Sequence, residues 1–265
     1  MIKLTQLLFP PKCIACGKLL PRERFERLFC EDCGGKWERA KKRCRDESNG
    51  CPVKEIESFD EGGKHELVPY SFIYTPGKRK NPENVLILRL KDTADKQCVS
   101  LVASELSEII TENIQVITKG GAKHDDALIA WIPRRRSAVQ RVGFDHMERV
   151  AKVLSKRLGI PAVPLLKRRA FTHEQKFLNS KERRMNAQRS MMIAGGVCLE
   201  GKVVLLIDDI VTTGASFAAA SKLLYEAGAE CVIPVALSAS ERPLEAGERR
   251  IEDNFNIIKK KDRST

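Results

Sequence analysis

The sequence predicts an α/β fold in which helices flank a parallel sheet, with a small metal-binding module at the N-terminus. The first observation is residues 203–207, an uninterrupted apolar run typical of a strand covered on both faces. The second is the helical spacing of apolar residues that follows a small-residue loop and stops at Gly228. The third is a pair of C-x-x-C-G elements near the N-terminus, separated by thirteen residues.

Other segments supply the remaining elements of this fold. Residues 127–132 form a second apolar run, which Pro133 closes. Asn81 followed by a proline is a typical helix start. The other predicted strands lie at 67–74, 160–166 and 231–237, and the predicted helices lie at 81–91, 96–112, 147–158 and 217–227.

Three segments lack such patterns. Residues 34–66 are charged and are predicted to form an irregular connector. Residues 167–189 form a long basic loop, helical from Ser180, that we interpret as a mobile lid over an anionic substrate. The predicted organisation is a zinc module with its connector at 1–58, the main domain at 59–240 and a charged tail at 241–265.

Composition and charge set the broad class of the protein. Of the 265 residues 42% are hydrophobic, enough for a core, and no apolar run approaches the roughly 18–20 residues that span a bilayer. The N-terminal apolar stretch is too short for a signal peptide, so we expect a cytoplasmic protein without membrane insertion. The net charge of +12 is concentrated at residues 134–190, with sixteen Lys/Arg against four Asp/Glu. Such a stretch suits a pyrophosphate-bearing substrate or nucleic acid, and solvated surface charge is the plain alternative.

Four of the nine cysteines have the spacing of a metal site: Cys13, Cys16, Cys30 and Cys33. In each C-x-x-C-G element a tight turn directs two thiolates to one point, and two such elements complete a tetrahedral site that typically holds Zn²⁺. Four protein ligands leave no open position, so we expect a structural metal that stabilises the module. Cys44 and Cys51 lack this spacing and are expected to be free thiols.

Two carboxylates, Asp208 and Asp209, end the apolar run at 203–207. The loop that follows contains small and hydroxyl residues: Thr212, Thr213, Gly214, Ala215 and Ser216. Free amides at a helix N-terminus suit a phosphate, and the glycine allows close approach of the backbone. The acids suit sugar hydroxyls or a bound Mg²⁺. A ribose 5-phosphate fits both parts of the motif, with its phosphate at the loop and its hydroxyls at the two acids. The alternative is an ordinary turn with Ser216 as helix cap.

This combination of apolar strand, two acids and T-T-G-x-[ST] resembles the 5-phosphoribosyl-1-pyrophosphate (PRPP) binding motif of type I phosphoribosyltransferases. The order of motifs along the chain resembles the ComF family of phosphoribosyltransferase-like proteins, which are associated with competence and DNA uptake. The motifs are L-F-P-P-x-C-x-x-C-G from Leu8, R-L-K ending at Lys91, I-P-R-R-R, G-F at Gly143, T-x-x-Q from Thr172, E-R-R-x-N from Glu182 and D-D-I-V-T-T-G-A-S.

Two features depart from the family pattern. The family's R-G-F-N-Q is replaced by V-G-F-D-H, which leaves the roles of Asp145 and His146 open. A further C-x-x-C pair is reduced to Cys44 and Cys51, so a second metal is not expected.

The resemblance implies a type I phosphoribosyltransferase fold that binds PRPP with Mg²⁺ and transfers phosphoribosyl to a nitrogen acceptor, which the sequence does not identify. Asp208 and Asp209 would hold the ribose hydroxyls and stabilise a cationic anomeric carbon, and Asp209 is also a candidate proton acceptor. The loop at 212–216 would bind the 5-phosphate. Cations after the second strand and in a hood at 167–186 would neutralise pyrophosphate: Arg134, Arg135, Arg136, Lys167, Arg168 and Arg183.

Other functions stay open. The same pocket could bind PRPP or a nucleotide without catalysis. Alternatively, the zinc module and basic segments would handle single-stranded DNA with a helicase-type competence partner. His146 and His173 are candidates for acid–base chemistry by residue type, although packing and surface roles are commoner for histidine. Trp131 lies in a strand pattern and is expected in the core.

Overall fold

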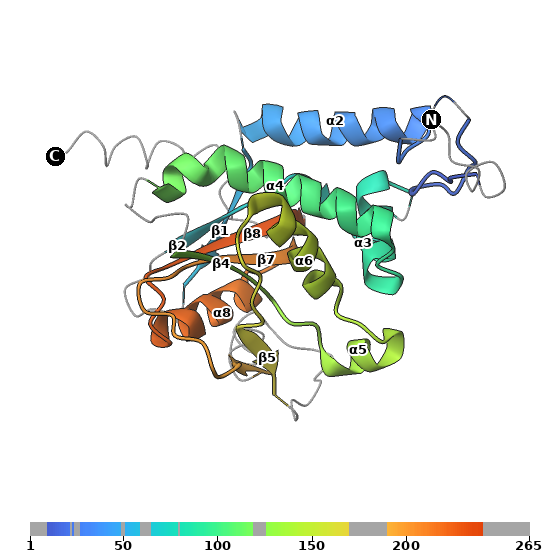
Figure 1. Ribbon diagram of the computed structural model, residues 1–265. Coiled ribbons are helices and arrows are strands. Elements are labelled where there is room, and N and C mark those ends of the chain that lie inside the picture. The colour runs from blue at the N-terminus through green and yellow to red at the C-terminus, as the bar shows by residue number, and fades with distance from the viewer. Residues whose placement is uncertain are drawn as a thin grey trace, which may run out of the picture.

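Four parallel strands form the central sheet of the computed structural model (Figure 1). The structure describes residues 10–21, 23, 27–48, 51–58, 65–78, 80–118, 126–169 and 190–240. The strand order is β3–β8–β7–β4, and each neighbouring pair is parallel. The strands are β3 (Phe72–Tyr74), β8 (Cys231–Ser240), β7 (Val203–Val211) and β4 (Ala127–Trp131). The three apolar runs at 127–132, 203–207 and 231–237 form strands of a parallel sheet, as predicted, and the structure shows that they are neighbours in it.

Helices cover both faces of this sheet, which explains why its strands are apolar on both sides. One face is covered by α3 (Pro82–Asp92), α4 (Lys96–Thr118) and α6 (His146–Leu158), and the other by α8 (Ala215–Glu226). These are the four predicted helices, with α4 extending further than expected. A short helix, α5 (Arg136–Val142), lies between β4 and α6 in the chain. The predicted α/β architecture is confirmed.

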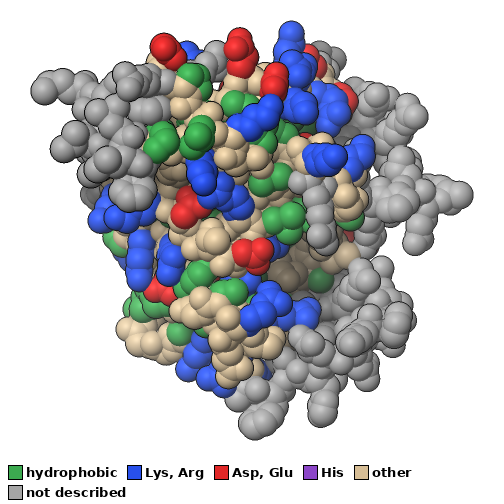
Figure 2. Space-filling model, turned by 90° about the vertical axis from the view of Figure 1, so that its right-hand side faces the viewer, with side chains coloured by type: hydrophobic (Ala, Val, Ile, Leu, Met, Phe, Trp, Pro, Cys, Tyr) green, Lys and Arg blue, Asp and Glu red, His purple; other side chains and the backbone are tan. Residues whose placement is uncertain are grey.

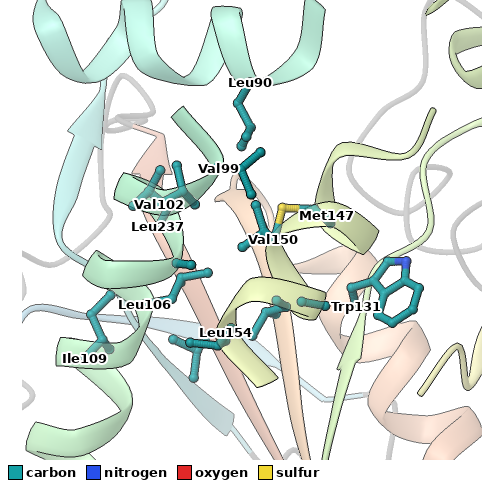
Figure 3. Close-up of a cluster of buried hydrophobic side chains, with 14 of the residues drawn as sticks. Leu90, Val99, Val102, Leu106, Ile109, Trp131, Met147, Val150, Leu154 and Leu237 are labelled. Atoms are coloured by element: carbon teal, nitrogen blue, oxygen red, sulfur yellow. The ribbon is translucent and has the colours of Figure 1, made fainter. Parts of the chain in front are cut away.

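The larger core lies between the sheet and helices α3, α4 and α6 (Figure 3). Met147, Val150 and Leu154 of α6 pack in it with Leu237 of β8 and with apolar residues of α4. Trp131 is 7% exposed and belongs to this core, as predicted. A second core on the opposite face joins β7 and α8. The carboxyl end of β7 is thus held between two packed layers.

The segment 34–66, predicted to be an irregular connector, contains regular structure. Residues 31–48 form helix α2 (Glu31–Ser48), and β1 (Val53–Glu57) follows. The prediction was wrong because the helix buries few side chains: Cys33, Trp37 and Cys44. Its position depends instead on long-range contacts, such as the Trp37 ring 4.2 Å from that of Phe72 and the 2.9 Å ion pair of Lys41 with Glu105.

Two predicted strands are also different in the structure. Residues 67–74 divide into β3 and β2 (His65–Pro69), and β2 pairs antiparallel with β1 as a separate hairpin. Residues 160–166 contribute one isolated bridge, from Ala162 to Ile129, before β5 (Leu166–Arg168) pairs antiparallel with β6 (Met191–Ile193). Pro161 and Pro164 interrupt the predicted strand at 160–166, because proline has no amide to donate to a sheet.

Residues 170–189 and 241–265, which include most of the predicted hood and the charged tail, lie outside the described residues. The candidates His173 and Arg183 belong to the first of these segments. Within the ranges that the structure describes, no helix is long and apolar enough to cross a membrane.

Candidate functional site

The acid pair lies inside β7, not after its end as predicted, because the strand continues to Val211. Successive side chains of a strand project to opposite faces, so Asp208 and Asp209 face different surroundings. Asp209 is 5% exposed and lies on the side of α3 and α6. Asp208 is partly exposed, and its charge acts on Arg168 of β5.

Asp209 has two partners that sequence analysis did not assign to it. Lys91 Nζ, at the end of α3, lies 3.0 Å from Asp209 Oδ2, and His146 Nε2, at the start of α6, lies 2.8 Å from the same oxygen. Burial alone would raise the pKa of Asp209, but the charge of Lys91 and the hydrogen bond from His146 lower the pKa by more. Burial likewise lowers the pKa of Lys91, and the charge of Asp209 raises it by more. Asp209 and Lys91 therefore form an ion pair at neutral pH.

Asp208 behaves in the opposite way. Burial and the negative charge of Asp209 raise the pKa of Asp208 well above its usual range. The amide of Asp209, which donates to Asp208 Oδ1 (2.9 Å), and the charges of Lys91 and Arg168 only partly offset this. The two neighbouring carboxyl groups therefore have pKa values shifted in opposite directions, and the role of Asp209 as a proton acceptor stays a prediction.

The predicted phosphate loop connects β7 to α8. Gly214 is the residue that caps α8 and has a left-handed backbone with φ +75°, so the turn requires glycine. Ser216 is therefore inside the helix, and the alternative in which Ser216 caps it is wrong. The amide of Ala215 donates to Thr213 Oγ1 (3.3 Å). The first turn of a helix has amides without intrahelical acceptors, and these amides suit an anion.

Gly214 has a second, unpredicted reason to be glycine. A Cβ at this position would overlap Cβ and Cγ2 of Ile56, which is 2% exposed on β1. The β1–β2 hairpin thus packs directly against the loop. Sequence analysis missed this contact because Ile56 lies in the segment that we interpreted as an irregular connector.

The first predicted pyrophosphate cation, Arg134, makes structural contacts. Its amide donates to Asp145 Oδ2 (2.8 Å), and its Nη1 donates to the carbonyl of Lys91 (2.7 Å). Arg135 and Arg136 are exposed, and Arg136 begins α5. The segment that follows β4 is therefore tied to the end of α3 through Arg134, with two exposed cations next to it.

The cations of β5 also divide into one structural and one exposed side chain. Arg168 Nε donates to the carbonyl of Pro133 (2.9 Å), and Arg168 Nη1 donates to Ser190 Oγ (2.6 Å). Burial lowers the pKa of Arg168, although the charge of Asp208 opposes this. Lys167 is exposed. Arg168 thus connects the β5–β6 hairpin to the segment after β4.

Asp145 and His146, whose roles were open, both support the site. The Asp145 side chain caps α6 by accepting from the amide of Met147 (2.9 Å), and it also accepts from the Arg134 amide. His146 is buried and binds Asp209, so it does not have a surface role. The signals that could have found Lys91 and His146 are the R-L-K motif and the departure at V-G-F-D-H, both of which had no assigned role.

The four predicted metal ligands converge. One potential ligand atom from each of Cys13, Cys16, Cys30 and Cys33 lies within 4.8 Å of the others, and Sγ of Cys16 and Cys30 are 3.7 Å apart. Tetrahedral Zn²⁺ with bonds of about 2.3 Å places sulfur atoms about 3.8 Å apart, so the donor set fits zinc. Burial raises the pKa of Cys13, but amide hydrogen bonds from Cys16 and Cys30 outweigh this and lower it to about 7, which favours the thiolate.

Backbone hydrogen bonds stabilise both C-x-x-C-G turns, the first knuckle at 13–17 and the second at 30–34. The amide of Gly17 donates to the carbonyl of Cys13 (2.9 Å), and the amide of Gly34 donates to that of Cys30 (2.8 Å). The second knuckle runs into the first turn of α2. Cys44 is buried elsewhere on α2, and burial raises the pKa of its thiol to about 11, as suits an unreactive packed residue.

Figure 2 shows the face of the molecule that lies at the right in Figure 1, where α3 and α5 are found. Lys and Arg side chains are spread over this face, and its surface is hollowed near the centre. Lys91 lies in the last turn of α3, and Arg135 and Arg136 are at the start of α5.

A domain match supports the interpretation of these residues. Residues 147–261 match the family model described as phosphoribosyl transferase domain. The matched segment contains the acid pair and the loop at 212–216, and it begins one residue after His146. The predicted resemblance to phosphoribosyltransferases is thereby confirmed, and the chain contains a phosphoribosyltransferase domain.

The chain is also similar to two named proteins. It is 33% identical over 92 residues to Competence protein F of Haemophilus influenzae, across 34% of this chain and 40% of that protein. It is 33% identical over 123 residues to an orotate phosphoribosyltransferase of Pyrococcus furiosus, across 46% and 63%. Both matches span less than two thirds of the relative's length. The first similarity agrees with the predicted resemblance to the ComF family.

Solved structures that resemble the chain include phosphoribosyltransferases. An adenine phosphoribosyltransferase from Thermoanaerobacter pseudethanolicus is 16% identical, with 71% of this chain and 95% of that chain covered and a TM-score of 0.34. A hypoxanthine phosphoribosyltransferase from Staphylococcus aureus is 17% identical, with 56% and 70% covered and a TM-score of 0.32.

Proposed function

We propose that the chain binds PRPP with Mg²⁺ at the carboxyl end of β7 and transfers the phosphoribosyl group to a nitrogen acceptor. The position of Asp209 is the observation that carries this proposal. It is a buried, ionised carboxylate in the strand that leads to the loop at 212–216, inside the segment that matches a phosphoribosyl transferase domain. Carboxylates with strongly shifted pKa values are concentrated at functional sites.

The chemistry assigned to the chain's own residues is positioning and charge stabilisation. The amides at the start of α8 and the hydroxyls of the 212–216 loop receive the 5-phosphate. The carboxylates of Asp208 and Asp209 hold the ribose hydroxyls and stabilise the positive anomeric carbon as pyrophosphate leaves. A bound Mg²⁺ would supply neutralisation of the pyrophosphate.

The cations of the site take two roles in this proposal. Arg134 and Arg168 position the segment after β4. Arg134, which is part of this segment, donates to the carbonyl of Lys91 at the end of α3, and Arg168 of β5 donates to the carbonyl of Pro133 at the start of the segment and to Ser190. Arg135, Arg136 and Lys167 are exposed and would attract the leaving pyrophosphate. Arg183, outside the described residues, remains a candidate for the same role.

Calorimetric titration with PRPP, with and without Mg²⁺, tests binding, and pyrophosphate release across a panel of bases and amines tests transfer. We expect Asp209→Asn to lower any transfer rate by about 100-fold or more. Asp126→Asn is the control, because Asp126 pairs with Lys202 away from the acid pair. No Mg²⁺-dependent binding would refute the proposal, and binding without release for any acceptor would leave non-catalytic PRPP or nucleotide binding.

A second candidate function is handling of single-stranded DNA with a helicase-type competence partner. The similarity to Competence protein F favours it, together with exposed cations on α2: Lys36, Arg39, Lys42 and Arg43. Phosphate contacts by such residues weaken steeply as salt is added.

Fluorescence anisotropy of a labelled oligonucleotide at several salt concentrations measures this binding. The double variant Lys36→Glu/Arg39→Glu on α2 is expected to weaken affinity by about tenfold and to reduce the salt dependence. Lys152→Glu/Lys156→Glu on the exposed side of α6 changes net charge by the same amount and is the control. Equal effects of the two variants would mean that α2 is not a specific DNA surface.

A further inference from the structure

The last turn of α3 contacts both the four-cysteine cluster and the acid pair. This turn carries the R-L-K motif, in which Arg89 and Lys91 flank Leu90. Leu90 is fully buried in the core between α3, α4 and α6 (Figure 3). Because Leu90 is fixed, the two cations on either side of it can hold separate partners in a defined geometry.

Arg89 binds the first cysteine knuckle. Its Nη1 donates to the carbonyl of Ile14 (2.7 Å), inside the turn between Cys13 and Cys16. Ile14 is 1% exposed and packs in the same core as α3. The knuckle is therefore joined to α3 by a charge-assisted hydrogen bond and by apolar packing.

Arg89 also orders the junction between α3 and α4. Its Nη2 donates to Asp95 Oδ2 (2.9 Å), and Asp95 Oδ1 accepts from the amide of Cys98 at the start of α4. The Arg89 carbonyl accepts from the amides of Thr93 and Ala94. The end of α3 thus has a conformation that depends on the Arg89 side chain and on its backbone.

Lys91, two residues after Arg89, completes the connection. Its Nζ lies 3.0 Å from Asp209 Oδ2, and its carbonyl accepts from Arg134 Nη1 (2.7 Å). A displacement of this turn would move Lys91 away from Asp209. It would also break the hydrogen bond from Arg134 to the carbonyl of Lys91, which holds the segment after β4.

We propose that Arg89 is a positioning residue that couples the metal-loaded cysteine cluster to the acid pair, by holding the last turn of α3 so that Lys91 stays against Asp209. The cluster then has a role beyond stabilising its own module. Without a shared metal the four thiols lose their common partner, the turn that presents the Ile14 carbonyl is released, and Arg89 loses its fixed acceptor. The consequence for PRPP rests on the proposed function, whereas the coupling itself does not.

Arg89→Ala in the full-length, zinc-loaded protein tests the coupling, with three measurements. Zinc content should stay near one per chain, because Arg89 is not a ligand. Hydrogen–deuterium exchange should increase in the last turn of α3 and at the carboxyl end of β7. PRPP affinity in Mg²⁺ should fall by about tenfold, a typical size for coupling between two sites.

Arg45→Ala is the matched control. Arg45 of α2 also makes a long-range ion pair, with Glu112 of α4 (2.6 Å), but it contacts neither the knuckle nor the acid pair. It should leave exchange at α3 and β7 and PRPP affinity unchanged. If Arg89→Ala does not fold, Arg89→Lys, which keeps the charge and loses one of the two contacts, should show the same changes at smaller size.

Removal of zinc from the wild-type protein by a chelator should increase exchange at the same two segments. Unchanged exchange there after either the Arg89 substitution or metal removal would overturn the coupling. If exchange changes as expected but the wild-type protein does not bind PRPP, the coupling stands and the proposed function fails.

Discussion

Asp208 and Asp209 are adjacent in β7, yet their pKa values are shifted in opposite directions, upward for Asp208 and downward for Asp209. The cause is that successive side chains of a strand project to opposite faces of the sheet. Asp209 projects toward Lys91 and His146, whereas Asp208 is partly exposed and has weaker compensation for the nearby charge of Asp209. The two acids should therefore affect stability with opposite signs.

We expect Asp209→Asn to lower the free energy of unfolding by about 2–3 kcal/mol at pH 7, because it leaves Lys91 without its partner. A lowered pKa adds stability above the unfolded-state value of about 3.9, and this stability is lost progressively as the pH falls from that value toward the lower pKa of the folded state. Urea denaturation at pH 7, 5 and 3 should show the wild type and the variant converging at acid pH. A difference that is independent of pH would contradict the ion pair.

Asp208→Asn should have the opposite effect at pH 7. A raised pKa means that the folded protein loses stability as the pH rises above the unfolded-state value of about 3.9 toward the folded-state value. Removing the acid should therefore increase the free energy of unfolding by on the order of 1 kcal/mol, as is common at functional sites. The gain should disappear below about pH 4. Asp126→Asn is the control at a partly exposed site and should change stability by less than about 0.5 kcal/mol.

The sequence was sufficient to predict the parallel sheet and its helices because these elements have local signals. Residues 203–207 are apolar at every position, and Gly228 follows the helix that they lead to. The four cysteines were predictable for the same reason, since their spacing alone fixes the knuckles. In each case the residues that decide the structure are close together in the chain.

The contacts that define the site were not predictable in this way. Lys91, His146 and Asp209 come from three elements that only the folded chain brings together. Ile56 lies in a segment with few apolar residues, and its position against Gly214 depends on the β1–β2 hairpin. The position of a charged helix such as α2 depends on contacts with residues far away in the chain, and the local spacing of apolar residues does not predict such contacts.

His146 should be replaceable by the residue that the ComF family has at this position. His146→Gln keeps a side-chain donor for Asp209, and His146 Nδ1 has no hydrogen-bond partner among the described residues that would be lost. His146→Phe removes the donor and should lower the free energy of unfolding by about 1–3 kcal/mol. Chemical denaturation compares the two variants, and equal losses would show that the hydrogen bond to Asp209 is unimportant.

Loss of the metal should lower the melting temperature. Cys16→Ser removes one of the four thiols, and a loss of about 3 kcal/mol lowers the Tm by about 6–12 °C in a chain of this size. Metal content measured by mass spectrometry should fall in parallel. Cys198→Ser removes another exposed thiol outside the cluster and should leave both quantities unchanged. Full metal content in Cys16→Ser would exclude the four-ligand site.

Gly214→Ala should be more damaging than the same change at another left-handed glycine. Gly143 has φ +83° and no atom within 4 Å of an added Cβ, so Gly143→Ala should cost only the backbone strain of about 1–2 kcal/mol. At Gly214 the overlap with Ile56 adds about 1–3 kcal/mol. Urea denaturation of both variants measures this difference.

A double-mutant cycle separates the two causes at Gly214. In an Ile56→Ala background the overlap is relieved, so the further change Gly214→Ala should cost about as much as Gly143→Ala does in the wild type. PRPP affinity should follow the same order, because the loop can present its amides only if the hairpin leaves its backbone undisturbed. If the cost of Gly214→Ala is the same in both backgrounds, Ile56 does not constrain the loop, and backbone strain alone requires glycine there.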